Sequence, residues 1–351
     1  MKATWTILCL ALLALGNGRT QEITIPDPPA ELAKFTRLLG NWEGKGVTKM
    51  ALDGPEIPWT ATSRYTTELN GFFIGEDTVV NIGPDLPRMV FRTLYGYDPG
   101  TKRYRSVGLG NMGGVWESEV HWADDDTMMN ANTGVEDGQV VVDRWVTKLK
   151  QDEISFVGMR GAGAGPFYEQ VKGDMRRVAG DIAETELSDV KALAPAAAEM
   201  RKLLRMKGRY RLSGSYRMGP DVAPIAILGE ERIIELFEGS VMGVHIKGDP
   251  AEGLGGPAYE AYAGFSWDAA NACYKTISAN NRGEIGSGEA RWVGEDLVVT
   301  GFRMQMGQPV QSRTVVKVDA EGRLRHGEAH VLMGVSEPLR SFEAIYTPQT
   351  D

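Results

Sequence analysis

The sequence predicts a mainly β protein that contains two tandem antiparallel β-barrels, each preceded by a short helix. Three observations lead to this prediction. The segment LLGNWEGKG at residues 38–46 places a tryptophan among glycines, between a helical pattern and a run of strands. The strands that follow alternate apolar and polar residues and are separated by turn residues, which is typical of antiparallel sheets. The second half of the chain repeats this arrangement about 168 residues later.

The repeat is faint in identity but nearly constant in spacing, so chance similarity between glycine-rich sequences is improbable. Gly40 and Trp42 match Gly208 and Tyr210 at a displacement of 168 residues. The other matched positions are Gly71 with Gly239 and Gly96-Tyr97 with Gly264-Phe265 at 168, Tyr104 with Tyr274 and Asn111 with Asn281 at 170, and Arg144 with Arg313 at 169. We interpret this as a tandem duplication in which the second copy gains two residues after Phe265.

Each copy is expected to begin with a short helix and to continue as roughly eight to ten strands. In DPPAELAKFTRLLG, Leu32, Phe35 and Leu39 recur at helical spacing, and Gly40 ends the pattern. The segment PAAAEMRKLLRMKG repeats this design before Gly208. Aromatic strands on both sides of an Asp-Pro-Gly turn, as in YGYDPGTKRYRSVGL, predict hairpins. A long antiparallel run of this kind avoids exposed edges by closing into a barrel.

The expected domain organisation is a signal peptide at residues 1–20, a first barrel at 28–178, a linker at 179–192 and a second barrel at 193–349. Lys2 precedes an apolar run from Ile7 to Leu15 that is too short to span a bilayer, and small residues follow it. This pattern predicts export to the periplasm or the medium; a buried N-terminal strand is the alternative. Only Cys273 would then remain, so the exported chain would contain no internal disulfide.

Composition excludes several classes of partner. Apolar residues make up 42% of the chain and charged residues 24%, which is ordinary for a globular protein. The formal net charge is −9 and there is no basic run, so we expect no nucleic-acid partner. No further apolar stretch is long enough to predict a membrane span.

A glycine-flanked tryptophan after a short helix is also the entry motif of calycin barrels, the group that includes lipocalins, fatty-acid-binding proteins and nitrobindins. Together with ELNGFFIGE, YGYDPGTKRY and an acidic hairpin, it resembles most closely the bacterial lipocalin-like Domain of Unknown Function 1579 family. The resemblance covers residues 30–178 well and 196–348 weakly.

The resemblance implies that Trp42 closes one end of the first barrel, below the entry helix, and that Tyr210 does so in the second. It also implies an arginine packed over the tryptophan. Arg144 and its repeat Arg313 are candidates for this structural role, and Arg176 is another. We further expect Gly44 and Gly46 to permit a bend of the first strand or close approach of the covering helix.

Nitrobindins hold haem through a histidine, which makes His326 or His330 in HGEAH a possible haem ligand by the same resemblance. The alternative is that both lie on one exposed strand face, because residues four apart on a strand share a side. A metal site that includes Glu328 is a further, weaker reading of the same segment. The spacing of HGEAH does not match a zincin motif. We therefore expect no cofactor and no metal.

The sequence contains no complete catalytic motif, which favours a binding protein. Trp116, Val120 and Trp122 fall on one face of the strand GVWESEVHW and are candidates to line a cavity for a small apolar or amphipathic molecule. One alternative is an enzyme that acts at a barrel mouth with His121 or His326 as general base. A second alternative is a structural or partner-binding module whose barrels are filled.

Overall fold

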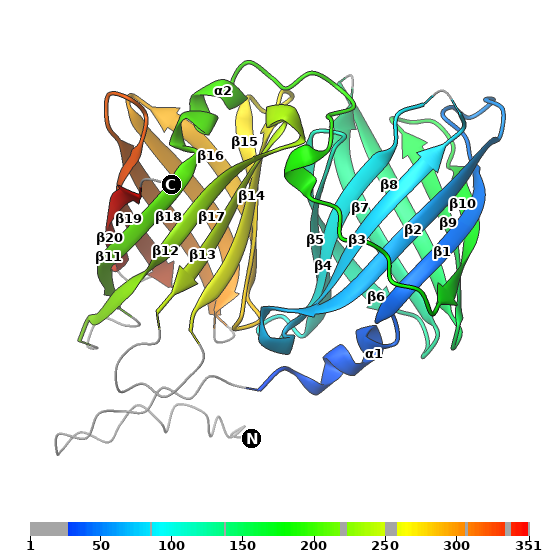
Figure 1. Ribbon diagram of the computed structural model, residues 1–351, viewed down its shortest axis with the longest axis horizontal. Coiled ribbons are helices and arrows are strands. Elements are labelled where there is room, and N and C mark those ends of the chain that lie inside the picture. The colour runs from blue at the N-terminus through cyan, green and yellow to red at the C-terminus, as the bar shows by residue number, and fades with distance from the viewer. Residues whose placement is uncertain are drawn as a thin grey trace, which may run out of the picture.

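The computed structural model describes residues 27–349 except 85, 137, 218–222, 250–257, 306–307 and 334–337. The expected signal peptide lies outside the described residues. The fold class is confirmed, because the chain forms two closed antiparallel barrels of ten strands each (Figure 1). Within the described ranges, no helix has the length and apolar character needed to cross a membrane.

The first barrel follows the short helices η1 (Ala30–Leu32) and α1 (Ala33–Thr36). Each strand pairs with its neighbours in the chain, and β1 pairs with β10 to close the barrel. The short helix η2 (Leu69–Gly71) connects β2 to β3. The strands are β1 (Gly40–Thr48), β2 (Ile57–Glu68), β3 (Phe73–Ile82), β4 (Met89–Asp98), β5 (Arg103–Gly110), β6 (Gly114–Trp122), β7 (Thr127–Glu136), β8 (Gln139–Leu149), β9 (Glu153–Ala162) and β10 (Tyr168–Val178).

The second barrel repeats this plan after a connecting segment that contains η3 (Leu187–Asp189). Its entry helices are α2 (Met200–Leu203) and η4 (Leu204–Met206), and η5 (Phe237–Gly239) connects β12 to β13. Strand β11 closes on β20. The strands are β11 (Gly208–Tyr216), β12 (Ile225–Leu236), β13 (Val241–Gly248), β14 (Glu260–Asp268), β15 (Cys273–Asn280), β16 (Ile285–Val293), β17 (Asp296–Gln305), β18 (Gln308–Val318), β19 (Leu324–Met333) and β20 (Leu339–Gln349).

Trp42 is fully buried in the core cluster at the helical end of the first barrel. Leu32, Phe35 and Leu38 pack into the same cluster, so the entry helix covers the tryptophan. The sequence interpretation named Leu39 in place of Leu38. Leu39 is half-buried and does pack against the cluster, and Leu38 is buried in it as well because α1 ends at Thr36 and the chain then turns.

Gly44 and Gly46 lie on β1, but what approaches them is not the covering helix. Gly46 faces the Lys172 carbonyl of β10 and the ring of Trp59, and Gly44 faces Met175. A side chain at Gly46 would overlap both neighbours. These glycines therefore allow close approach of β10 and of the Trp59 ring, which corrects the expectation of helix contact.

The duplication extends to individual hydrogen bonds. The buried Asn111 side chain accepts from the amide of Val90 and donates to the carbonyl of Arg88. Asn281, which lies 170 residues later, accepts from the amide of Glu260 and donates to the carbonyl of Ala258. Each asparagine thus satisfies backbone groups beside the start of the fourth strand of its barrel.

Strand pairing corrects the position of the two added residues. Phe73 pairs with Gly96, and its repeat Val241 pairs with Ser266. Gly96 is therefore equivalent to Ser266 rather than to Gly264. The two residues are added between β13 and β14, before Phe265 and not after it.

The two barrels pack side by side, with α1 at the lower end of the first and α2 at the upper end of the second (Figure 1). A shared apolar cluster joins them. It contains Leu69, Phe72, Phe73, Val90, Leu94, Val107, Val115, Val190, Leu236, Phe237, Val241, Ile277, Ala279 and Ile285. The linker residue Val190 is part of this core, so the connection between the barrels is itself packed.

Contacts across this interface occur in reciprocal pairs. Gly113 of the first barrel lies against Ser240 of the second. Gly283 is equivalent to Gly113 and Phe72 is equivalent to Ser240, and these two residues also lie against each other. Likewise the amide of Val115 donates to Ser266, while their equivalents Ile285 and Gly96 are in contact. Reciprocal contacts of this kind define an isologous interface, which here relates two halves of one chain.

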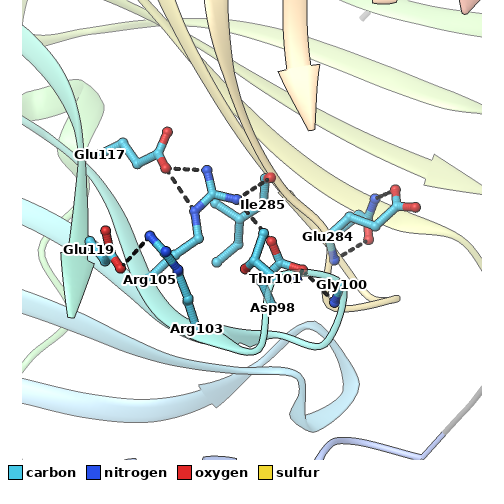
Figure 2. A network of polar contacts seen from close by, with 10 residues as sticks. Asp98, Gly100, Thr101, Arg103, Arg105, Glu117, Glu119, Glu284 and Ile285 are labelled. Atoms are coloured by element: carbon cyan, nitrogen blue, oxygen red, sulfur yellow. Dashed lines mark hydrogen bonds and ion pairs between the residues drawn. The ribbon is translucent and has the colours of Figure 1, made fainter. Parts of the chain in front are cut away.

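A polar network at the edge of the interface supplements the apolar contacts. Figure 2 shows Arg105 between the carboxylates of Asp98 and Glu117, with a third bond to the carbonyl of Ile285 in the second barrel. The Arg105–Asp98 pair recurs in the second barrel as Lys275–Asp268, at 3.0 Å. The carbonyl contact fixes Arg105 of one barrel to the backbone of the other.

Candidate ligand site

The interior of the second barrel contains a cavity of about 500 Å³. One end lies beside the Tyr210 plug, where Met206 and Leu324 line it, and the other end reaches Tyr216 and Arg282. Apolar side chains cover most of its wall. They include Leu212, Ile225, Ile227, Ile233, Met242, Val244, Ile246, Phe265, Val299, Val316, Val331 and Phe342.

A comparison of the two interiors gives a physical reason for this cavity. In the first barrel, Trp59 stacks on Phe156 at a centroid distance of 5.6 Å, and Phe156 packs on Trp145 at 6.0 Å. Strand pairing gives the equivalent positions in the second barrel. Trp59 corresponds to Ile227, and Trp145 corresponds to Thr314. Phe156 corresponds to Gly327, and Trp116 corresponds to Gly286. Four large rings of the first barrel are therefore replaced by smaller residues. The space that the rings fill in one barrel is available in the other.

Glu231 places a carboxyl group at the closed end of the cavity. It is the Cα partner of Tyr210, so it lies directly beside the plug. It is buried, and burial raises its pKa to about 7, although the hydrogen bond from the Tyr346 hydroxyl acts in the opposite direction. At neutral pH this carboxyl group is therefore close to its own midpoint, whereas an exposed glutamate would be fully ionised.

The first barrel also contains a buried glutamate, but its carboxylate is enclosed by donors. Tyr65 and Thr78 donate to one oxygen of Glu76 at 2.9 and 2.8 Å, and Tyr95 donates to the other at 2.7 Å. Burial raises the pKa of Glu76, while these three hydrogen bonds lower it. The carboxylate is thus held inside a saturated polar cluster, which is typical of a structural role.

The predicted ligand residues lie inside the first barrel and pack against other side chains there. Val120 belongs to the buried cluster around Trp42, and Trp122 packs on Phe35 at a centroid distance of 5.8 Å. Trp116 covers Gly108. The alternation of β6 was therefore interpreted correctly, but the cavity described above lies in the other barrel.

Arg144 and Arg313 do not pack over the plugs. Arg144 lies over the ring of Phe167. Arg313 is exposed on β18, because its chain neighbours Ser312 and Thr314 are the residues of this strand that line the cavity. Arg177 takes the expected place instead, with its guanidinium 4.3 Å from the centre of the Trp42 ring. Trp42 and Arg177 are Cα partners, so both side chains fall on the same side of the sheet.

The neighbouring Arg176 is exposed on the other side of the sheet, where Glu43 is its Cα partner. Strand parity distinguishes the two arginines, because Met175 points into the barrel and Arg177 is two residues beyond it.

The histidines lie on outer faces. His121 is exposed beside Glu119 on β6. His326 and His330 alternate with the cavity-lining Ala329 and Val331, and they pair with Glu343 and Glu328. His326 and His330 therefore lie on the face opposite the cavity-lining residues, so neither side chain is placed to ligate a haem bound in the cavity. In the part of the chain that the structure describes, no group of three or more His, Cys, Asp or Glu side chains is placed to hold a metal ion.

The sequence interpretation missed Glu231, although a signal was present. Ile225, Ile227 and Ile233 alternate along β12 with residues of the other face, and Glu231 has the parity of the isoleucines. A carboxyl group on the apolar face of a strand is unusual and is worth attention in any sequence.

The fold and this cavity define the class of the protein as a tandem of two ten-stranded antiparallel barrels, with a cavity inside the second. Residues 27–177 match the family model described as "Protein of unknown function (DUF1579)". This match covers the first barrel and confirms the resemblance that the sequence indicated there. No curated protein matches the chain.

Two solved structures illustrate the similarity to known proteins. Rv2717c from M. tuberculosis is 13% identical, covers 43% of this chain and 99% of its own, and has a TM-score of 0.30. A DUF3598-family protein of unknown function from Nostoc punctiforme is 9% identical, covers 92% of this chain and 100% of its own, and has a TM-score of 0.20.

Proposed function

We propose that this chain is an exported binding protein that holds a small, largely apolar molecule inside its second barrel. The observation that carries the proposal is the cavity of about 500 Å³, whose wall is mainly apolar and whose closed end contains Glu231. Its volume lies within the range of roughly 300–1,000 Å³ that is usual for ligand pockets. The basic, apolar and small-residue pattern at the N-terminus supports export.

A titration with diphenylhexatriene, a neutral rod-shaped probe that fluoresces when it leaves water, tests this proposal. The purified protein is expected to bind about one probe molecule per chain with saturable fluorescence. Thr314→Trp restores the ring that the first barrel has at Trp145 and is expected to abolish binding. Thr300→Trp is the matched control, because Thr300 is exposed on the adjacent strand.

Ile227→Trp, which restores the counterpart of Trp59, provides a second filling variant in case the first does not fold. Circular dichroism would confirm that each variant retains its β structure. Probe binding that is equal in the parent, the filled variants and the Thr300→Trp control would contradict the proposal, because the probe would then not be in the barrel.

A further inference from the structure

The ligand proposed for the second barrel must complement Glu231, so this inference rests on the proposed function. An ionised carboxylate has about four lone-pair sites for hydrogen bonds. Glu76 in the first barrel receives three hydroxyl donors. Glu231 receives one, from Tyr346, among the residues that the structure describes. Glu231 lines the cavity, and a largely buried carboxylate that has few donors and no cationic partner is costly.

The position of Glu231 indicates which part of a ligand would reach it. Ile225 and Glu231 are six residues apart on β12, which corresponds to about 20 Å along the strand. Ile227 and Ile233 line the wall on either side of Glu231, and Arg282 lies near the far end. An elongated molecule with one polar head would place that head beside Glu231 and its tail along the apolar wall.

The charges of the wall decide what kind of head fits. Among the described lining residues, the acidic ones are Glu231, Asp249 and Glu284, and Arg282 is the one basic residue. Arg282 stacks on Tyr259, away from the closed end. A carboxylate head would therefore meet Glu231 without a cation to neutralise either group. A hydroxyl head would supply one hydrogen bond but would leave the buried charge in place.

We propose that the second barrel binds an amphipathic primary amine, whose ammonium group pairs with Glu231 and whose apolar tail fills the cavity. An ammonium group supplies three donors and a positive charge, so it satisfies both needs of the buried carboxylate. Because burial raises the pKa of Glu231 to about 7, binding of the cation would replace a proton that the empty site partly retains near neutral pH.

Displacement of diphenylhexatriene by three compounds of equal chain length tests this inference. Decylamine, decanol and decanoic acid are titrated at neutral pH, each below its micelle concentration. Decylamine is expected to displace the probe at a concentration at least about tenfold lower than decanol, which corresponds to a charge-assisted contact. Decanoic acid is expected to be the weakest. Glu231→Gln should remove the advantage of the amine while decanol displacement stays unchanged.

Controls separate this inference from the proposed function. Glu230→Gln changes a neighbouring exposed carboxylate on the outer face and should leave the preference for amine intact. Glu231→Ser, which introduces the residue type of the equivalent Ser63 in the first barrel, is the second variant in case Glu231→Gln does not fold, and it should likewise remove the preference for amine. If the probe binds but decanol or decanoic acid displaces it as well as decylamine does, the amine inference is wrong and the binding function stands. If the probe does not bind at all, the proposed function fails first.

Discussion

Trp42 and Tyr210 make the same hydrogen bond at equivalent ends of the two barrels. The indole N–H of Trp42 donates to the carbonyl of Leu38, and the hydroxyl of Tyr210 donates to the carbonyl of Met206, each at 2.7 Å and each four residues back along the chain. Two chemically different rings thus satisfy the same backbone group where the entry helix ends. The two plugs therefore share their burial and this hydrogen bond, although their rings differ.

Removal of the first plug should destabilise the protein strongly. Trp42→Ala deletes a fully buried aromatic side chain and is expected to lower the free energy of unfolding by about 3–5 kcal/mol. Urea denaturation followed by circular dichroism measures this loss. Met112→Ala, at an exposed methionine, serves as the control and should change the midpoint little. An unchanged midpoint for Trp42→Ala would contradict the assignment of this residue as a plug.

The two neighbouring arginines of β10 should differ in their contribution to stability. Arg177 stacks on Trp42 and also donates to the carbonyl oxygens of Leu39 and Arg37. Arg177→Met is expected to lower the free energy of unfolding by about 2 kcal/mol. Arg176→Met, at the exposed position, should have an effect within about 0.5 kcal/mol. Equal losses for the two variants in urea denaturation would refute the assigned contact.

The repeated asparagines should have matching effects in their own barrels. Asn111→Ala and Asn281→Ala each leave buried backbone groups without a partner and are expected to cost about 2–3 kcal/mol. Hydrogen exchange gives a local measurement, because the amide of Val90 should lose protection in the first variant and that of Glu260 in the second. Loss of protection at both amides in either variant would argue against independent roles.

Glu231 should make stability depend on pH in an unusual direction. Its folded pKa is about 7, above the value of 4.5 for the unfolded carboxyl, so the folded state binds the proton more tightly between these values. The contribution of Glu231 to the free energy of unfolding is therefore fully present below about pH 4.5 and is lost as the pH rises to about 7. Glu231→Gln should remove this decrease, which makes the variant more stable than the parent above pH 7 by on the order of 3 kcal/mol.

Urea denaturation of both proteins across this pH range measures the difference. The groups that face Glu231 are Tyr210 on β11 and Tyr346 on β20, and burial raises the pKa of both hydroxyls, so neither titrates in this window. Glu230→Gln is the matched control. A parent and a Glu231→Gln variant with parallel pH profiles would show that the carboxyl group titrates normally.

Much of the fold could be predicted from local patterns. The spacing of Gly40, Trp42, Gly208 and Tyr210 indicated the duplication, and the resemblance to calycin barrels implied that the two rings close the barrel ends. The hairpin around Asp98 was also predictable, since its side chain accepts from the amide of Gly100 in the turn. Signals of this kind act over a few residues and can be recognised in one sequence.

The candidate site could not be predicted in the same way. The equivalence of Trp145 with Thr314 and of Phe156 with Gly327 depends on strand register, which changes when residues are added in turns. Matching the glycines without the strand register placed the two added residues of the second copy after Phe265, whereas they precede β14. Arg177 differs from Arg176 by one position, which exchanges the inside of a barrel for its outside.

The reciprocal interface has a consequence for how the two barrels can differ. In a dimer of identical chains, any substitution occurs in both subunits, so a change that opened one barrel would open the other and weaken both. When the two barrels are fused into one chain, a substitution changes only one of them. The copy with Trp59, Trp145 and Phe156 can keep these rings packed inside its barrel, while the copy with the smaller Thr314 and Gly327 contains a cavity.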